Sequence, residues 1–437
     1  KGIREYCIQN QRPYLVECMT FRMRGHEEAS GTKYVPKELF LEWGKKDPVV
    51  NYENYLLANG ILSDDAVNKI RLGIKEEIEE ELKVALAEPA LIPDSEKEIA
   101  DAYAPVSTNY NSRLTINSSQ RELRLIDAIA EALKQAMEKH DNLILMGQDI
   151  AEYGGVFKAT EGLVRIFGRE RVRNTPLCES AIIGAALGLS VKGFKSMVEM
   201  QFADFVTMGF NQIINNLAKI YYRWIQNADV VVRMPTGAGV GAGPFHSQSN
   251  EAWFVHTPGL KVVYPSTPFD AKGLLLASFE DPNPVMFFEH KALYRAISGN
   301  VPEEYYTLEI GKANLINEGD DVSIITYGAG VHWAIEAIGN ISADVLDLRT
   351  LLPYDKEAIA NTVKKTGKAI ILHEDTLTGG IGGEISAWIT ENLFEYLDAP
   401  VMRCASLDTP VPFAIALENN FLPKERFRKQ LSYLLSY

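Results

Sequence analysis

Cysteine is scarce in this sequence, and long apolar runs are missing from it. The four cysteines, Cys7, Cys18, Cys178 and Cys404, are widely separated and form no C-x-x-C pair. This spacing argues against a disulfide framework and against a zinc site. The sequence contains no apolar run of about 18 residues and no signal-peptide pattern. These absences argue against a membrane protein and predict a location in the reducing cytoplasm.

Basic residues are also fewer than acidic residues. The chain has 44 lysine and arginine residues against 58 aspartate and glutamate residues, which gives a formal net charge of -14. A nucleic-acid-binding protein would be expected to carry a basic face, so this class is disfavoured. The 437 residues are 46% hydrophobic and 23% charged. Such a composition indicates a soluble globular protein of roughly two or three domains.

A dinucleotide-binding fingerprint is missing despite a glycine-rich stretch at 237–259, which reads GAGVGAGPFHSQSNEAWFVHTPG. Its first four glycines occupy every second position, and Ala242 stands where the G-x-G-x-x-G pattern needs its third glycine. No long helical pattern follows, so a nicotinamide oxidoreductase is the least favoured class. The stretch is better interpreted as a loop that carries the polar residues 246–250 to a rim. Either of its histidines, His246 or His256, could instead be structural.

The N-terminal quarter of the chain has a mostly helical pattern. Residues 13–23 are apolar and β-branched, which predicts a buried strand. A helix is expected from the cap candidates Ser63, Asp64 and Asp65 to a stop at Pro89. The stretch that follows, as far as about residue 120, is rich in Pro, Ser, Asn and Thr and is interpreted as a linker.

From Arg121 onward, helical segments alternate with short apolar strands. We expect helices at 121–139, from Ala181 and at 204–222, and the expected strands include NLILMG, SMVEMQF, DVVVRMP and LKVVYPS. A second series begins near Asp321 with DVSIITYG, DVLDLRT and KAIILHED. This alternation predicts an α/β fold of two domains with mostly parallel sheets.

Several polar residues lie near expected strand ends. Glu179 is placed where a strand ends and a helix begins, and an ordinary acidic residue beside a helix dipole, with Ser180 as the cap, explains it equally well. Glu199 and Gln201 fall on one side of a short strand, and Phe205 falls in the turn after it. Each of these signals is weak by itself.

Six ordered stretches together resemble one family. They are DIAEYGGVFKATEGL, TPLCESAIIGAALG, EMQFADFV, FHSQSNEAWFVHTPGLKVV, DAKGLLLASFEDPNPVMFFE and LDLRTLLPYDKEAI. They resemble the β subunit of thiamine diphosphate-dependent 2-oxo acid dehydrogenases, particularly the branched-chain members. Residues 1–104 resemble the end of the α subunit through YLVECMTFRMRGHEEASG and DPVVNYENYLLANGIL. The resemblance implies a decarboxylating component in which an α-type part and a β-type part are fused in one polypeptide.

The resemblance also implies the domain organisation. A helical α-subunit tail at 1–104 and a linker at 105–120 precede a pyrimidine-binding transketolase-like domain at 121–300. A transketolase C-terminal-like domain at 301–437 completes the chain. The G-D-G…N motif, which binds magnesium and diphosphate in this family, does not occur in the sequence. By resemblance, that motif would lie upstream of Lys1, so residues 1–437 alone are expected to be inactive.

The family's chemistry assigns roles to particular residues. Thiamine diphosphate becomes a nucleophile when its thiazolium ring loses a proton, and a carboxyl group bonded to the aminopyrimidine promotes this loss. By resemblance that carboxyl is Glu179, and Leu177, Gln201 and Phe205 line the pyrimidine pocket. Phe205 stands where a branched-chain enzyme can have tyrosine. His246 corresponds to a histidine that assists acylation of the lipoyl group, whereas His256 inherits no such role.

Two further sites follow from the resemblance. His26 corresponds to a histidine near the cofactor diphosphate, and Glu27 follows it where related enzymes have a phosphorylatable serine, so control by phosphorylation there is not expected. Family β subunits hold a structural potassium ion, and an ordinary strand and turn would explain the same stretch. The residues that correspond to the potassium site are Ala228, Val230, Val231, Ser278, Asp281 and Asn283.

The resemblance therefore implies oxidative decarboxylation of a 2-oxo acid, with transfer of the acyl group to a lipoyl-bearing acyltransferase. A branched-chain substrate is favoured, and a pyruvate-type substrate is the alternative. A transketolase-like synthase and a non-catalytic assembly module remain as further alternatives. A homodimer is expected, with the apolar stretch DFVTMGFNQIINNLAKIYY as a plausible contact surface.

Overall fold

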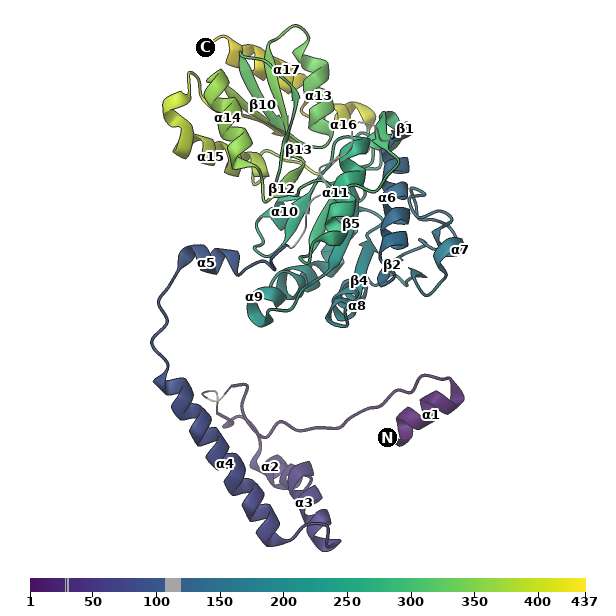
Figure 1. Ribbon diagram of the computed structural model, residues 1–437, viewed down its shortest axis with the longest axis vertical. Coiled ribbons are helices and arrows are strands. Elements are labelled where there is room, and N and C mark those ends of the chain that lie inside the picture. The colour runs from purple at the N-terminus through teal and green to yellow at the C-terminus, as the bar shows by residue number, and fades with distance from the viewer. Residues whose placement is uncertain (28, 30, 107–118) are drawn as a thin grey trace. The chain divides into compact units, whose positions relative to one another are not determined.

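The computed structural model describes residues 1–27, 29, 31–106 and 119–437. The described residues form two compact units, Lys1–Pro93 and Asp94–Tyr437 (Figure 1). Most of the linker expected at 105–120 lies outside the described residues. Among the described residues, no helix is both long enough and apolar enough to cross a bilayer.

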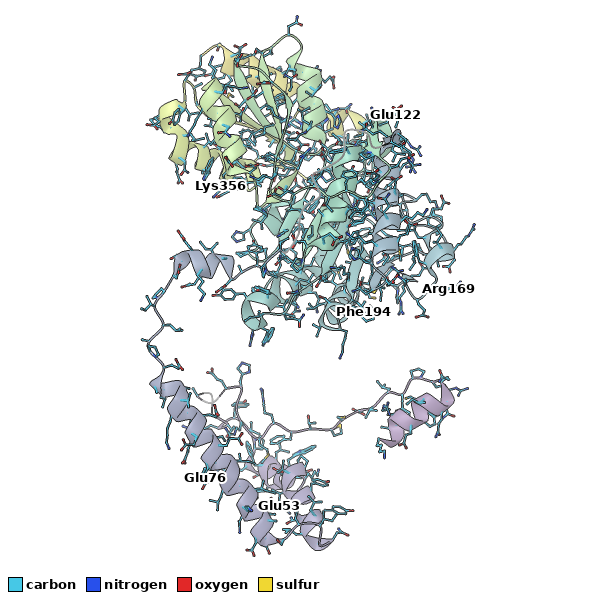
Figure 2. The ribbon with its side chains drawn as sticks, viewed as in Figure 1. Glu53, Glu76, Glu122, Arg169, Phe194 and Lys356 are labelled. Carbon is cyan, nitrogen blue, oxygen red and sulfur yellow. The ribbon has the colours of Figure 1, made fainter. Side chains whose placement is uncertain are left out.

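Helices make up the regular structure of the N-terminal unit. They are α1 (Gly2–Asn10), α2 (Lys37–Gly44), α3 (Pro48–Ala58) and α4 (Asp64–Ala87). The Ser63 hydroxyl accepts a hydrogen bond from the Ala66 amide at 3.2 Å, so the predicted cap of α4 is confirmed. Glu53 on α3, labelled in Figure 2, pairs with Arg71 on α4 at 2.6 Å. This ion pair joins α3 to α4.

The strand predicted at 13–23 is wrong. These residues are extended but mostly exposed, and Leu15 is 95% exposed. An apolar run becomes a strand only where a neighbouring strand accepts its backbone hydrogen bonds. The described residues of Lys1–Pro93 include no strand that could pair with it.

The first sheet of the second unit follows the order β12-β6-β7-β5-β4-β2-β3, and all neighbours are parallel except β12 and β6. Its strands are β2 (Leu143–Gly147), β3 (Val172–Asn174), β4 (Lys195–Glu199), β5 (Val230–Thr236), β6 (Lys261–Val263), β7 (Val285–His290) and β12 (Thr350–Leu352). The side chains of β5 and β7 are buried along their whole length, as expected for parallel strands covered on both faces. The predicted α/β class is confirmed.

Two apolar cores cover the two faces of this sheet. Helices α6 (Leu125–Lys139) and α11 (Pro268–Glu280) pack together in one core, and α8 (Glu179–Val191) belongs to the other. Figure 1 shows α6 and α11 beside β5. The remaining elements of this part are α5 (Ser95–Ala100), β1 (Gln120–Arg124), α7 (Leu163–Phe167), the 3-10 helix η1 (Ala203–Gly209), the π-helix η2 (Gln212–Leu217), α9 (Ile220–Trp224), α10 (Ala252–Val255), α12 (Leu293–Ala296) and β8 (Ser298–Pro302).

Three expected helix boundaries need correction. The helix expected at 121–139 starts at Leu125, because residues 120–124 form β1 and pair with β8. The helix expected from Ala181 starts at Glu179 with Cys178 as its N-cap, so Ser180 is not the cap. The helix expected at 204–222 is divided into η1, η2 and α9.

The second sheet has the order β14-β13-β10-β11-β9, in which only the β11–β9 pair is antiparallel. Its strands are β9 (Asn314–Asn317), β10 (Val322–Thr326), β11 (Ala343–Asp347), β13 (Ala369–Thr376) and β14 (Met402–Ser406). The helices of this part are α13 (Ala329–Ile338), α14 (Lys356–Thr366), α15 (Ile381–Leu393), the 3-10 helix η3 (Phe394–Tyr396), α16 (Ile415–Phe421) and α17 (Lys424–Leu435). Both sheets belong to one compact unit, and the predicted domain division near residue 300 stays a prediction.

Candidate functional site

Glu179 is the first residue of α8 and follows β3 through a short loop. Its carboxylate accepts a hydrogen bond from Gln148 Nε2 at 2.9 Å. Gln148 comes directly after β2, so both side chains lie beyond the carboxyl ends of neighbouring parallel strands. Open α/β sheets bind ligands at this edge, and the positive end of the helix dipole favours the carboxylate there.

Gln148 has an unused acceptor beside Glu179. Its side chain is 6% exposed, and within the described part of the chain its Oε1 atom has no hydrogen-bond partner. A buried amide oxygen without a partner is costly. The pair therefore offers one carboxylate and one carbonyl oxygen to a ligand that carries hydrogen-bond donors.

The other residues predicted for the pyrimidine pocket lie in the loops that follow β3 and β4. Leu177, in the loop before α8, is 81% exposed, although it is a large apolar residue. Gln201 and Phe205 follow β4 and are half-buried. A Cβ atom added at Gly209, the last residue of η1, would lie 3.4 Å from the Glu179 carbonyl oxygen. The start of α8 and the end of η1 are thus in close contact.

His246 belongs to an aromatic cluster with two phenylalanines. Its ring centroid lies 4.8 Å from that of Phe202 and 5.5 Å from that of Phe205, both in edge-on geometry. The centroids of Phe202 and Phe205 are 5.6 Å apart. The structure thereby brings together His246 and Phe205, which the sequence predicted separately. Phe202 was missed, although its position beside Gln201 could have indicated it.

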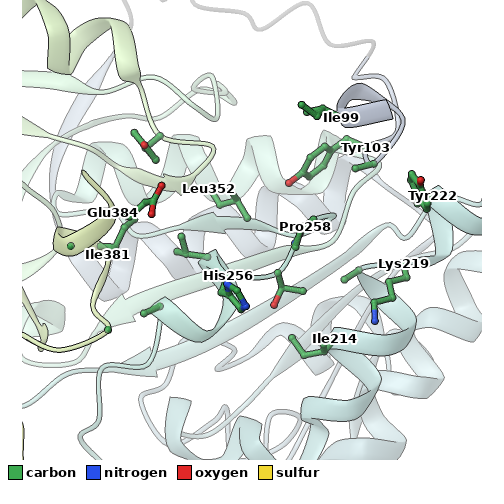
Figure 3. Close-up of a pocket in the computed structure, with 18 of the residues that line it drawn as sticks. Ile99, Tyr103, Ile214, Lys219, Tyr222, His256, Pro258, Leu352, Ile381 and Glu384 are labelled. Atoms are coloured by element: carbon green, nitrogen blue, oxygen red, sulfur yellow. The ribbon is translucent and has the colours of Figure 1, made fainter. Parts of the chain in front are cut away.

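His256 lies in a different place. It is exposed and lines a groove of about 1470 Å³, and neither Glu179 nor His246 lines this groove. Figure 3 shows His256 between Glu384 on one side and Lys219 on the other. The two histidines of the glycine-rich stretch therefore have distinct surroundings.

A buried ion network links β4, β5 and β7. Arg233 contacts Glu289 through Nε and Nη2 at 2.6 Å each, and its Nη1 contacts Glu199 at 2.6 Å. Tyr294 also donates to Glu289, at 2.6 Å. Burial favours the neutral guanidine, but Glu289 and Glu199 outweigh it and raise the pKa of Arg233. Burial raises the pKa of Glu199, and Arg233 opposes this shift.

The residues predicted for potassium are all buried: Ala228, Val230, Val231, Ser278, Asp281 and Asn283. Asp281 Oδ1 accepts from the Asn283 backbone amide at 2.9 Å and from Asn283 Nδ2 at 2.8 Å. Lys261 contacts the other carboxylate oxygen of Asp281, and the Ala104 amide donates to Asn283 Oδ1 at 2.7 Å. The oxygens of these two side chains are thus already occupied, and an ion here would depend on main-chain carbonyls.

His26 lies in the N-terminal unit, where it is exposed. No group of three or more His, Cys, Asp or Glu residues that could hold a metal ion is found among the described residues. The assignment of His26 to the diphosphate stays a prediction.

The two linked α/β sheets, with a carboxylate at the helix that follows β3, define the transketolase class of fold. Residues 121–297 match the family described as "Transketolase, pyrimidine binding domain", and residues 311–426 match "Transketolase, C-terminal domain". Residues 1–94 match "Dehydrogenase E1 component". A solved structure, "Split gene transketolase, inactive beta4 tetramer", has a TM-score of 0.56 at 21% identity and covers 72% of this chain and 98% of that one, which shows the fold.

Two curated relatives show to which family within the transketolase class of fold the chain belongs. The 2-oxoisovalerate dehydrogenase subunit beta of Bacillus subtilis (strain 168) is 50% identical over 307 residues, which cover 68% of this chain and 93% of that protein. The pyruvate dehydrogenase E1 component subunit beta of the same organism is 43% identical over 314 residues, 70% of this chain and 96% of that protein. The chain belongs to the E1 family of thiamine diphosphate-dependent 2-oxo acid dehydrogenases. The family predicted from the sequence is confirmed.

Proposed function

We propose that the chain carries the aminopyrimidine side of the cofactor site in an enzyme that decarboxylates a branched-chain 2-oxo acid. The enzyme then transfers the acyl group to the lipoyl group of an acyltransferase. The observation that carries this proposal is the Glu179 carboxylate, held by Gln148 beyond the ends of β2 and β3. The higher identity to the 2-oxoisovalerate relative, 50% against 43% to the pyruvate relative, supports the branched-chain substrate.

The residues present fit the pyrimidine half of thiamine diphosphate, which supplies a nucleophilic carbanion when it is bound. Glu179 would exchange a proton with a ring nitrogen while Gln148 fixes the direction of its carboxylate. The unpartnered Gln148 Oε1 offers an acceptor to a ring substituent. Leu177 and Phe205 would supply apolar contact, and Gln201 would supply an amide.

His246 is proposed to assist acyl transfer to the lipoyl group. Its half-buried ring stands against Phe202 and Phe205. Burial raises the pKa of Asp204, while the Gln248 amide and His246 oppose this shift. Magnesium and the diphosphate would be held by an α-type part of the enzyme, in which His26 would also act. The cytoplasmic location stays a prediction.

A substrate panel tests the proposed function in the complete enzyme, with its α-type diphosphate-binding part present. We expect cofactor-dependent decarboxylation of 2-oxoisovalerate with a higher kcat/KM than for pyruvate or 2-oxoglutarate. One methylene is worth about 1–3 kcal/mol, so the preference over pyruvate should be about 10-fold or more. Turnover of sugar phosphates without a lipoyl acceptor would instead indicate a transketolase-like synthase. A protein that does not bind the cofactor would support the assembly module.

A homodimer is proposed for the second unit. Large apolar side chains at Met208, Tyr222, Trp224 and Ile225 are largely exposed along η1 and the region of α9. Apolar surface of this kind is typical of interfaces between subunits. Sedimentation of the protein at about micromolar concentration should give a dimer or a larger assembly. A monomer under these conditions would contradict the proposal.

A structural potassium ion is proposed beside β5 and the end of α11. The Ala228 amide donates to the Pro282 carbonyl at 3.1 Å, which draws the two main chains together. We expect replacement of sodium by potassium at equal ionic strength to raise the thermal midpoint by ~1–4 °C, because an ion that binds only the folded state stabilises it. The same midpoint in both salts would show that Asp281 and Asn283 form a structural turn without an ion.

A further inference from the structure

The glycines at the start of the 237–259 stretch have an unusual backbone conformation. The φ angles of Gly237, Gly239, Gly241 and Gly243 are 93°, 86°, 68° and 72°. A Cβ atom at Gly237 would lie 2.3 Å from His290 Nε2, so that position also needs glycine for space. Because glycine adopts positive φ angles without steric cost, these positions let the main chain bend so that its amide N–H groups approach other side chains closely.

Two carboxylates of the protein accept hydrogen bonds from the amides of this stretch. Glu418, on α16, accepts hydrogen bonds from the Gly239 amide at 2.8 Å and from the Gly241 amide at 3.3 Å and 3.2 Å. Glu374, on β13, accepts from the Ala238 amide at 2.5 Å. Both glutamates are nearly fully buried. Two residues from the region of the second sheet therefore bind the main chain of the loop that carries His246.

Glu374 also contacts the part of the loop that follows His246 in the sequence. Its Oε1 atom accepts from the Ser249 hydroxyl at 3.3 Å, and its Oε2 atom lies 2.6 Å from His290 Nε2. Burial alone would raise the pKa of Glu374, but His290 and the Ala238 amide outweigh it, and the pKa is lowered. Glu374 thus remains an ionised acceptor. It contacts the chain before His246, at Ala238, and after His246, at Ser249.

Lys291 supplies the opposite charge to this arrangement. Its Nζ atom donates to the Gly237 carbonyl at 2.7 Å. Burial lowers the pKa of Lys291 to about 8, and Glu374, Asp204 and Glu418 oppose the shift. The loop is held through its amides by two carboxylates and through a carbonyl by an ammonium group.

We propose that Glu418 is a positioning residue for His246, an inference that rests on the proposed function of His246. The His246 ring contacts Phe202 and Phe205 by their edges, and these contacts do not fix its direction as hydrogen bonds would. Its direction therefore depends on the main chain that carries it. A displacement of about 1 Å can reduce a rate by about 100-fold. Glu418 sets the position of that main chain from α16.

The test compares two half-reactions of the complete enzyme in the Glu418→Gln variant. Glutamine keeps the size of the side chain and one acceptor oxygen, but it places N–H donors where the second carboxylate oxygen of Glu418 now faces the Gly241 amide, and it removes the negative charge. We expect acylation of lipoamide to fall by about 10- to 100-fold, and decarboxylation with an artificial electron acceptor to stay within about twofold of wild type. Glu425→Gln, an exposed glutamate on α17, is the matched control and should change neither rate.

A double-mutant cycle separates positioning from general stability. In a His246→Ala background, Glu418→Gln should cause no further loss of lipoamide acylation, because the group that it positions is gone. His256→Ala, at the other histidine, should leave acylation near wild type. Losses that add in the double variant would overturn the positioning role. So would a Glu418→Gln variant that acylates lipoamide at the wild-type rate.

A second variant disturbs the contact between Glu418 and Gly241 by changing the loop instead of Glu418. Gly241→Ala adds a methyl group in open space, but a side chain strains its positive φ angle. It should reduce acylation selectively even where Glu418→Gln fails to fold, and an unchanged rate would overturn the proposal. A wild-type enzyme that decarboxylates 2-oxo acids but never acylates lipoamide would overturn the proposed function itself. The two failures are thus distinguishable.

Discussion

Glu179→Gln is expected to lower turnover of the complete enzyme by about 10²- to 10⁴-fold, the usual contribution of a positioned acid–base group. Glutamine can still hydrogen-bond to Gln148 and to the pyrimidine ring, but it cannot exchange a proton with a ring nitrogen. Folding should change little, because the half-buried carboxylate at the start of α8 contributes about 0.3–1 kcal/mol through the helix dipole.

The measurement for Glu179→Gln combines decarboxylation rates with calorimetric titration of the cofactor. We expect the affinity for the cofactor to fall far less than kcat, since the metal and the diphosphate supply most of the binding energy. Glu170→Gln, an exposed glutamate that pairs with Arg173, serves as the control. Near-normal decarboxylation by the Glu179 variant would remove this residue from the mechanism.

The strands of both sheets could be predicted from the sequence because they are buried on both faces. Their apolar runs, such as NLILMG for β2 and DVSIITYG for β10, need no alternation. The same reasoning was wrong for residues 13–23, where an apolar run has no strand to pair with. It also missed β1, because the partner of β1 is β8, which is distant in the sequence.

Some residues of the candidate site could be predicted from the sequence, whereas the contacts that hold them could not. Glu179 and His246 were found by resemblance, whereas the residues alone gave only weak signals. The contact of Gln148 with Glu179 and the contact of Glu418 with Gly239 join segments that are far apart in the chain. A local pattern carries no information on such pairs. The alternate glycines were interpreted only as a loop that carries polar residues, and the hydrogen bonds of their amides to Glu374 and Glu418 were not predicted.

Charged residues inside apolar strands were another available signal. Arg233 interrupts the apolar run of β5, and Glu289 does the same in β7. Charges are almost never fully buried unless they are paired, so each of these residues predicts a partner. The pairing that the structure shows, with Glu199 as the third member, fixes the strands from whose ends Gln201 and the 237–259 loop depart.

Arg233→Met is expected to lower the free energy of unfolding by about 3–5 kcal/mol. Methionine fills part of the space, but Glu199 and Glu289 would remain buried without the guanidinium that now contacts both at 2.6 Å. Denaturant titration of the variant against wild type measures the loss. Arg165→Met, an exposed arginine on α7, is the matched control and should lie within about 0.5 kcal/mol of wild type.

The pH dependence of the loss in unfolding free energy of Arg233→Met identifies the cause of that loss. Burial already raises the pKa of Glu199 against the effect of Arg233, so removal of Arg233 should raise it further. A carboxyl group whose folded pKa exceeds its unfolded value stabilises the fold at low pH, and this stabilisation disappears as the pH rises through the folded pKa. The deficit of Arg233→Met should therefore be smaller at about pH 5.5 than at about pH 8. An equal deficit at both values would mean that protonation of Glu199 does not contribute, and that the lost contacts of Arg233 alone destabilise the variant.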